Sequence, residues 1–412
     1  MMSNSPKIFK NLLTQQELNL EQSRQQGDWA DLAELLNRGK KNLQKEISLS
    51  KVRERDHKAP LLSEKWQPLG RNPILVIDAS RAVPGEVGFL HLIYYETYKI
   101  IEGALLAAFM VGSASGYFYV AADQRRAFSL IQKALDECYA VGLLGQNILG
   151  TGFSFHLQVH MGSTDYVSYS DDVLTDSLAG EKQPRGTLFG QPVLIHKVET
   201  LATIPTILRR GGEWFSALGT PHSTGTKVFS FSGHVNQPCV VEESFGVSLR
   251  SSLEQYAGGV RGGWSHLNFI FPSGLGSLPL PKSFCNDLVL SYEGIGAFHS
   301  WLGSGSIVVA NGSVNWLMGT LIAMDFLGNI PVSGCLFCRE GIPVCVGLLK
   351  EGQTRERKPE EDMKRTISLS TLSQQIETRC QCGYAAYALN PIKGYLRYSE
   401  ISMDREVESH VL

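Results

Sequence analysis

Short, uniformly apolar runs alternate with helical patterns after Pro73. The first run, Ile-Leu-Val-Ile before Asp78, has the pattern of a strand buried on both faces. Strands that alternate with helices at this spacing predict a parallel sheet in an α/β domain, which we place at residues 71–222. The expected elements are strands at 74–78, 116–122 and 153–160 and helices at 95–111, 125–141 and 198–210.

The pattern then changes, and apolar and polar residues alternate with a period of two. Residues 226–235 alternate as a strand, and a helix at 249–256 and a strand at 267–271 follow. A small α+β module is therefore expected at 223–300. Over residues 301–412 the pattern is mostly helical, with a loop that contains two cysteines.

The N-terminal residues 1–70 are polar and charged, with one helical pattern around 29–43. Within them, residues 51–65 carry a dense run of lysine, arginine, aspartate and glutamate. Charge runs of this kind are usually solvated, so we expect 51–65 to be an extended surface segment and not part of a core. The whole N-terminal region is expected to form a helical arm.

The composition is that of a globular protein of two or three domains: 412 residues, of which 43% are hydrophobic and 19% charged. The formal net charge of −2 gives no reason to expect nucleic acid as a partner. The longest apolar runs, 100–111 and 307–326, are interrupted by polar residues such as Glu102 and Asp325, so we expect no direct membrane insertion. No signal peptide or clear mitochondrial presequence is evident, and the eight cysteines are expected to be thiols in a reducing compartment.

Four cysteines form two close pairs that could hold a metal. Cys335 and Cys338 stand in a C-x-x-C, the spacing that directs two thiolates to one centre, and Cys380 and Cys382 form a second pair downstream. Such a set is compatible with an iron–sulfur centre or a zinc ion, and a C-x-x-C can also be redox-active or inert. The cysteines expected to be buried, small hydrophobic residues are Cys138, Cys239 and Cys285.

Four longer segments carry a family resemblance. They are Gly-Thr-Lys-Val-Phe-Ser-Phe-Ser-Gly-His-Val-Asn-Gln-Pro-Cys at 225–239, Ala-Gly-Gly-Val-Arg-Gly-Gly-Trp at 257–264, Val-Glu-Thr-Leu at 198–201 and Cys-Arg-Glu-Gly at 338–341. With them the chain resembles the NADH-oxidising flavoprotein subunit of respiratory complex I, and most closely its mitochondrial form. The resemblance extends over residues 8–398, nearly the whole chain.

The resemblance implies a fold, an activity and partners. The fold would be a Rossmann-like α/β domain for FMN and NADH, then a ubiquitin-like (β-grasp) module, then a C-terminal helical domain with a four-iron (4Fe-4S) cluster. The family's activity is NADH oxidation through FMN, with electrons passed to that cluster. The implied partners are a thioredoxin-like 2Fe-2S subunit and a large iron–sulfur subunit of complex I, on the matrix side of the mitochondrial inner membrane.

The flavin positions of this family are altered here. The family's flavin loop is rich in glycine, which lets the backbone approach the phosphate, and it ends in Lys-Trp. The matching residues 50–66 contain no glycine, and Glu54 and Asp56 bring negative charge to a phosphate position. We therefore expect FMN binding to be impaired. The remnant FMN and NADH positions are Arg53, Arg55, Lys65 and Asp78.

Other motifs for flavin and NADH are altered as well. An Asn-Ala-Asp-Glu run of the family reads Asp78-Ala-Ser-Arg81 here, and its Gly-Glu-Glu-Thr reads Tyr169-Ser-Asp-Asp172, which we expect to be a solvated turn. Lys197 stands where the family has an asparagine, and the phenylalanine loop that stacks on NADH is absent. No catalytic residue is therefore identified.

The cluster motif is incomplete. The family spaces three cysteines as C-x-x-C-x-x-C with a fourth further along, and here Val332 stands at the first position. Cys335, Cys338 and Cys382 match the other three, and Cys380 is an additional thiol. Three ligands leave one iron of a cubane unsaturated unless Cys380 or another group supplies the fourth. A tetrahedral zinc site built from the four cysteines is the alternative.

Three functions are compatible with these residues. The first is a non-catalytic member of the family that acts as a structural or interaction subunit, because the losses fall on cofactor positions while core motifs remain. The second is an active NADH dehydrogenase (quinone-linked) flavoprotein subunit with altered FMN and cluster sites. The third is an interaction domain whose segments are held together by a metal ion, zinc in place of iron, and which has no role in electron transfer.

Overall fold

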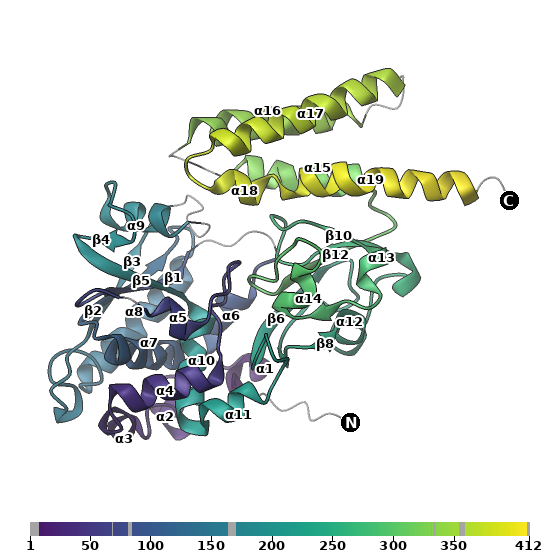
Figure 1. Cartoon of the computed structure of the whole chain (residues 1–412). Helices are drawn as coiled ribbons and strands as arrows, with labels where there is room; N and C mark the ends of the chain where they lie inside the picture. Colours follow the sequence, from purple (N-terminus) through teal and green to yellow (C-terminus); the bar gives the residue numbers. More distant parts are fainter. Residues whose placement is uncertain are drawn as a thin grey trace.

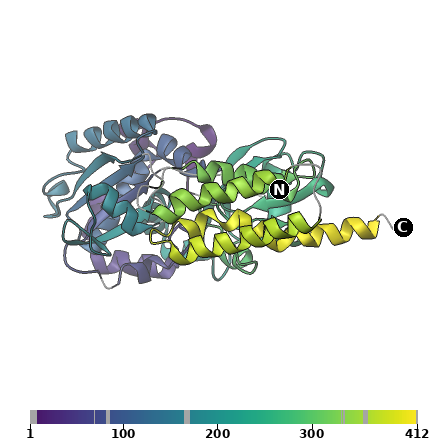
Figure 2. The same cartoon turned by 90° about the horizontal axis from the view of Figure 1, so that it is seen from above.

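The chain forms two five-stranded sheets and a C-terminal group of helices (Figure 1). Seen from above, the C-terminal helices run across the other parts of the molecule (Figure 2). The computed structural model describes residues 8–67, 69–80, 85–163, 170–330, 332, 335–353 and 359–409.

The N-terminal region is helical, as expected, and it is packed against the rest of the chain. The amides of Ile8 and Phe9 donate hydrogen bonds to the Glu242 carboxylate of the second sheet at 3.0 and 2.9 Å. Leu43 and Ile47 bury one face of α4. The helices of this region are α1 Lys10–Thr14, α2 Leu20–Gln25, α3 Leu32–Asn37, α4 Lys40–Ser50 and α5 Leu62–Lys65.

The prediction that residues 51–65 form a solvated surface segment is wrong. Glu54 and Arg55 are both buried. Their charges are paired inside the protein, Glu54 with Lys65 of the same segment and Arg55 with Glu199 of the α/β domain. Part of a dense run of charge can therefore enter the interior, because Glu54 and Arg55 each meet an opposite charge there.

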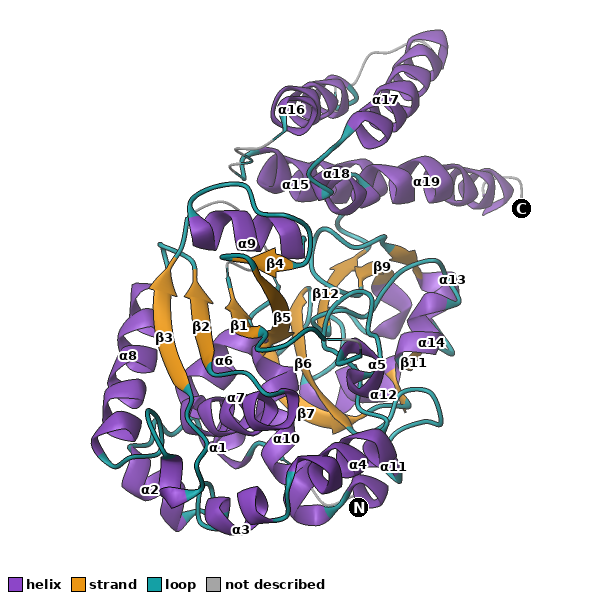
Figure 3. Ribbon diagram, turned by 60° about the vertical axis from the view of Figure 1, so that its left-hand side comes forward, coloured by secondary structure: helices purple, strands orange, loops and turns teal. Residues whose placement is uncertain are grey.

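The first sheet has the order β3-β2-β1-β5-β4, and Figure 3 shows β3, β2, β1 and β5 side by side. These four strands are parallel, which confirms the predicted parallel sheet, and β4 joins β5 as an antiparallel edge. Strand β1 is buried along its whole length, which explains its apolar run, whereas only the residues 194–196 of β5 are buried. The strands are β1 Ile74–Ala79, β2 Ser115–Val120, β3 His156–Met161, β4 Thr187–Leu188 and β5 Gln191–Lys197.

Two helices of the first domain lie in close contact. A Cβ atom added at Gly103 of α7 would lie 1.9 Å from the carbonyl oxygen of Leu201 on α10, so only glycine permits this approach. The contact lies near the N-terminal end of α10, where the site described below is built. The helices are α6 Gly88–Tyr95, α7 Thr97–Val111, α8 Arg125–Ala140, α9 Asp171–Ala179, α10 Val198–Arg210 and α11 Gly212–Ser216.

The second sheet has the order β10-β9-β12-β6-β7 and forms the expected α+β module. Strand β12 lies between β6 and β9, although it follows residue 300, where we expected the module to end. The strands of this sheet are β6 Thr226–Gly233, β7 Cys239–Ser244, β9 Leu267–Phe271, β10 Leu280–Pro281 and β12 Ser306–Asn311. Strands β8 Val247–Ser248 and β11 Val289–Leu290 pair with each other in a separate two-stranded sheet. The helices are α12 Leu249–Tyr256, α13 Lys282–Cys285 and α14 Tyr292–Gly296.

The C-terminal helices pack on the second sheet through aromatic side chains. The rings of Phe269 on β9 and Trp316 on α15 stack with their centroids 4.4 Å apart. No helix in the described part of the chain is both long and apolar enough to cross a membrane. The helices are α15 Trp316–Gly328, α16 Leu336–Glu351, α17 Pro359–Arg379, α18 Tyr384–Ala388 and α19 Asn390–Ser409.

Candidate functional site

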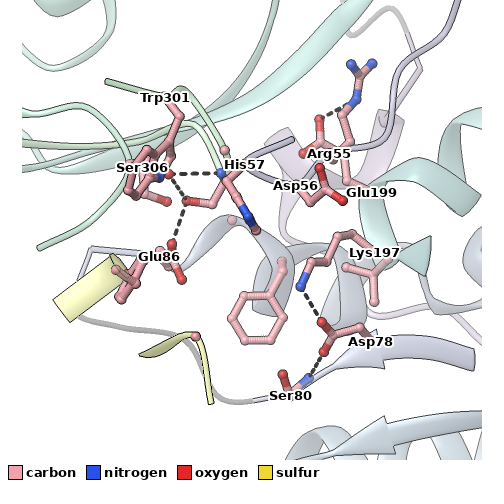
Figure 4. A pocket seen from close by; sticks show the side chains of 18 of the residues that line it. Arg55, Asp56, His57, Asp78, Ser80, Glu86, Lys197, Glu199, Trp301 and Ser306 are labelled. Atoms are coloured by element: carbon pink, nitrogen blue, oxygen red, sulfur yellow. Dashed lines mark hydrogen bonds and ion pairs between the residues drawn. The ribbon is translucent and has the colours of Figure 1, made fainter. Parts of the chain in front are cut away.

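A cavity of about 200 Å³ lies where the three parts of the molecule meet (Figure 4). Asp78 and Lys197 line it from the carboxyl ends of β1 and β5, the edge of a parallel sheet at which α/β proteins bind ligands. Trp301 lines it from the second module and Tyr387 from α18, and their rings stack. This is the region in which the family resemblance places FMN and NADH.

Beside this cavity, the Glu54 carboxylate is seated at the N-terminus of α10. One carboxylate oxygen accepts hydrogen bonds from the backbone N–H of Lys197 at 3.1 Å and from the Thr200 hydroxyl at 2.5 Å. The other accepts one from the Lys65 ammonium at 2.9 Å. Backbone N–H groups at a helix N-terminus, supported by a lysine, are the donors that proteins use to bind phosphate. Here a side chain of the same chain occupies them.

His196 completes the surroundings of Glu54, and its protonation follows from its neighbours. The Trp66 indole can only donate, so the Nε2 atom of His196 accepts its hydrogen bond at 3.0 Å. The proton of a neutral ring must then be on Nδ1, which donates to the Glu54 carboxylate. Burial lowers the pKa of His196, although Glu54 opposes the shift, in agreement with a neutral imidazole.

The Glu54 carboxylate is ionised in this environment. Burial by itself would raise its pKa, but Lys65, His196 and the Thr200 hydroxyl together hold the pKa of Glu54 well below its usual range. The carboxylate therefore places a full negative charge at the helix N-terminus. His196 and Thr200 were not singled out from the sequence. His196 lies in strand β5, and Thr200 lies in the first turn of α10, within the Val-Glu-Thr-Leu segment, and only the fold relates either residue to Glu54.

Arg53 and Arg55, two of the remnant cofactor positions, hold the segment 51–65 in place. Arg53 donates to the carbonyl oxygens of His222 and Ala59 at 2.7 and 2.8 Å, and it does not line the cavity. The buried Arg55 guanidinium donates to the carbonyl oxygen of Thr226 at 2.8 Å and forms an ion pair with Glu199. Both arginines thus serve the fold in this structure.

Asp78 and Lys197 neutralise each other. The two residues are register neighbours at the ends of β1 and β5, and the Lys197 ammonium donates a hydrogen bond to the Asp78 carboxylate (Figure 4). Burial would raise the pKa of Asp78, but Lys197 and Ser80 hold it below its usual range. Both positions carry asparagine in the family that the chain resembles, so this ion pair replaces two neutral amides at the cofactor edge.

The residues present do not fit a bound FMN phosphate. A phosphate needs unoccupied donors, and the backbone N–H of Lys197, the Thr200 hydroxyl and the Lys65 ammonium all bind Glu54. A dianion brought next to that buried carboxylate would also be repelled by it. Asp171 and Asp172 begin α9, and Asp172 lies 3.7 Å from Arg185 on the surface. The motif positions Arg81 and Tyr169 lie outside the described residues.

The four cysteines singled out from the sequence come together at one point. Cys335 and Cys338 lie at the N-terminus of α16, and Cys380 and Cys382 lie in the loop between α17 and α18. Their four sulfur atoms all lie within 4.8 Å of one another. Val332, at the family's first ligand position, is buried in the same apolar cluster and offers no ligand atom. As predicted, Cys138 and Cys285 are buried, whereas Cys239 is partly exposed.

Three segments of the chain match families of known proteins. Residues 47–206 match the Nuo51 FMN-binding domain, and residues 227–291, where we expected the ubiquitin-like module, match the SLBB domain. Residues 324–405 match the NADH-ubiquinone oxidoreductase-F iron-sulfur binding region. The FMN-binding and iron–sulfur regions thus follow each other in the order that the resemblance implies.

Whole-chain relatives and solved structures agree with this order. The F subunit of NADH-quinone oxidoreductase of Rickettsia felis is 34% identical over 99% of this chain and 99% of its own length. The same subunit of Rickettsia bellii (strain OSU 85-389) is 35% identical over the full length of both. A chain of the NAD+-reducing NiFe-hydrogenase in its H2-reduced state matches 87% of this chain with a TM-score of 0.74 and 20% identity, which shows the fold alone. This chain spans 62% of that hydrogenase chain.

Proposed function

The chain belongs to the family of the F subunit of NADH-quinone oxidoreductase, and from that premise we propose that it is a subunit of a complex I-like assembly whose own flavin site is closed. Its role is then structural: it provides the folded surfaces of the flavoprotein subunit without oxidising NADH itself. An FMN-binding domain and an iron–sulfur region are present in the chain. The proposal is that in this member of the family the FMN-binding domain is kept as a fold but does not bind FMN.

The observation that carries the proposal is the position of Glu54. Its buried carboxylate takes the helix N-terminal N–H, the hydroxyl and the ammonium that a phosphate would need. For FMN to bind there, the Glu54 side chain would have to move out of the interior into solvent. The segment that carries it is, however, fixed by the hydrogen bonds of Arg53 and Arg55. Moving a paired, buried charge in this way costs several kcal/mol.

The second candidate is an active NADH dehydrogenase with altered sites, and one observation favours it. The cavity of about 200 Å³ at the carboxyl ends of β1 and β5 remains, lined by the aromatic rings of Trp301 and Tyr387. A flat ligand could enter that space. At the ends of β1 and β5, however, the cavity is lined by the Asp78–Lys197 ion pair and not by the two amides that the family has at these positions. The structural role is therefore the better supported of the two.

The partners proposed for this role follow from the family. The F subunit belongs to a multi-subunit complex, and we extend the resemblance to a thioredoxin-like 2Fe-2S subunit and a large iron–sulfur subunit as neighbours. The resemblance to the mitochondrial form of this subunit is the reason for which we propose a place on the matrix side of the inner membrane. The relatives described above are bacterial, so location is best tested directly by fractionating cells that contain the tagged chain.

Two measurements test the proposal. The purified chain, supplied with FMN, is assayed for NADH-dependent reduction of ferricyanide beside the Rickettsia bellii relative as a positive control. We expect activity in the control and none above background in this chain. In the second, the tagged chain is isolated from its own cells, and other complex I subunits are expected to accompany it. NADH-dependent reduction by this chain, or its recovery without any such subunit, would overturn the structural role.

A further inference from the structure

We propose that Cys335, Cys338, Cys380 and Cys382 bind one zinc ion in a tetrahedral site, in place of the four-iron cluster that the family implies. The two cofactors make different demands on the spacing of the thiolates. A single ion is bound by all four sulfurs at once, whereas each thiolate of a cubane binds a different iron at a different corner. The distances between the sulfur atoms therefore distinguish them.

The spacing of the sulfur atoms is that of a single ion. The sulfur of Cys338 lies 3.4 Å from that of Cys380 and 3.7 Å from that of Cys382, and the latter two are 3.5 Å apart. Four sulfurs bound to one zinc ion at 2.3 Å lie about 3.8 Å from one another at tetrahedral angles. The four sulfurs here, all within 4.8 Å, surround a space for one ion. A cubane, with its own four irons and four sulfides, would have to push them apart.

The identity of the fourth ligand leads to the same conclusion. The family's first ligand position is held by Val332, whose buried side chain packs in the apolar cluster that includes Cys335 and Cys338. Cys380 supplies the fourth thiol from a position only two residues before Cys382. Two cysteines so close in sequence place both sulfurs on one side of the centre. This arrangement suits one ion and leaves the far corner of a cubane without a ligand.

A backbone N–H group points at one of these sulfurs, as such groups do at thiolates bound to metal. The N–H of Tyr384 donates to the Cys382 sulfur at 3.4 Å. Such outer donors stabilise the negative charge that four thiolates leave on a zinc site and hold the ligands in place. Zinc has no redox chemistry, so the role of the ion would be structural. It would connect the start of α16 to the loop between α17 and α18.

This inference goes beyond the proposed structural role and is tested without flavin or NADH. The full chain is produced without oxygen in cells supplied with both iron and zinc, and its zinc, iron and acid-labile sulfide are measured. We expect about one zinc ion per chain and no sulfide. Iron with an equal amount of sulfide and a brown cluster spectrum would overturn the proposal. A single iron without sulfide, or a chain without metal, would overturn it as well.

A pair of variants locates the ion. Cys380→Ser removes a thiol that the zinc site needs and that the family's cluster lacks, so we expect it to lose zinc on dialysis against a chelator. Cys345→Ser removes another buried thiol from α16 that lies outside the group, and it should retain zinc. Retention of zinc by Cys380→Ser would contradict the four-thiolate site. If that variant does not fold, the wild-type chain is loaded with Co²⁺ in place of zinc, and the absorption spectrum of the bound Co²⁺ reports its ligands. Tetrahedral thiolate bands support the site, and their absence contradicts it.

Discussion

The Lys65 ammonium donates a hydrogen bond to the Glu54 carboxylate at 2.9 Å, and both belong to the segment that matches the family's flavin loop. The Glu54 side chain is fully buried and that of Lys65 is only 17% exposed. Burial alone would lower the pKa of Lys65 and raise that of Glu54. The attraction between the two charges opposes burial and, together with the other partners of each group, leaves the pKa of Lys65 above its usual value and the pKa of Glu54 below. The lysine that the family keeps beside its flavin phosphate thus binds an internal carboxylate here.

Replacement of this carboxylate should destabilise the fold strongly. Glu54→Gln leaves the Lys65 charge buried without its partner, and losing one partner of a buried ion pair costs roughly 3–5 kcal/mol. Urea unfolding of the two chains measures the difference. The matched control is Glu254→Gln, which removes the same charge from the exposed pair between Arg250 and Glu254 and should cost less than about 1 kcal/mol. Equal effects of the two substitutions would contradict the internal role of Glu54.

The ion pair between Asp78 and Lys197 should show strong coupling. In a double-mutant cycle with Asp78→Asn and Lys197→Gln, each single change removes one charge of the ion pair and leaves the other, whereas the double change removes both. We expect the double variant to be less destabilised than the sum of the single changes by roughly 1–3 kcal/mol in unfolding experiments. Additive effects would mean that the two side chains do not depend on each other.

The close contact between α7 and α10 makes a prediction about Gly103. Gly103→Ala places a methyl group 1.9 Å from the carbonyl oxygen of Leu201, so the helices must separate, which should cost roughly 1–3 kcal/mol of unfolding free energy or more. The control is Gly347→Ala in α16, where nothing lies within 4 Å of the new methyl group. In that exposed helical position alanine should stabilise the protein by about 0.5–1 kcal/mol. A neutral effect at Gly103 would show that the contact is not close.

The buried carboxyl of Glu96, which accepts hydrogen bonds from Asn11, predicts a dependence of stability on pH. Burial raises its pKa to about 7, against the opposing effects of Lys99 and Asn11. In the unfolded chain the pKa returns to about 4.3. Between these values the folded state binds more protons, so the contribution of Glu96 to stability is complete below the unfolded pKa and is lost as the pH rises through 7.

The measurement compares wild type with Glu96→Gln by urea unfolding at pH 5 and pH 8. All other titrating groups are shared by the two proteins and cancel in the difference. Relative to wild type, the variant should gain up to about 3 kcal/mol of unfolding free energy between the two pH values. A difference that does not change with pH would show that the Glu96 carboxyl titrates as an exposed group does.

Local periodicity was sufficient to predict much of the fold. Helices α10 and α12 and strand β9 begin and end where the patterns predicted them, because each has a clear apolar face or a continuous buried run. Strand β12 was missed as a member of the second sheet, since its neighbours β6 and β9 are distant in sequence. Pairing between distant strands is not encoded in local periodicity.

The site could be predicted only in part, for the same reason. The loss of glycine and the arrival of Glu54 at a phosphate position are visible in the sequence, and so are the four cysteines. That Glu54 turns inward is not visible, because its partners His196 and Thr200 lie 142 and 146 residues away. The local composition of residues 51–65 predicts exposure to solvent. Interactions with distant residues instead keep Glu54 and Arg55 in the interior.

The retention of FMN by the purified chain tests the central claim most directly. The chain is incubated with excess FMN, passed through a gel-filtration column, and examined by absorption before and after NADH, beside the Rickettsia bellii relative treated in the same way. Because Glu54 occupies the donors of the phosphate position, we predict that this chain elutes without flavin while the control retains it. A chain that elutes with about one FMN, bleached by NADH, would contradict the closed site and make this protein an active dehydrogenase subunit.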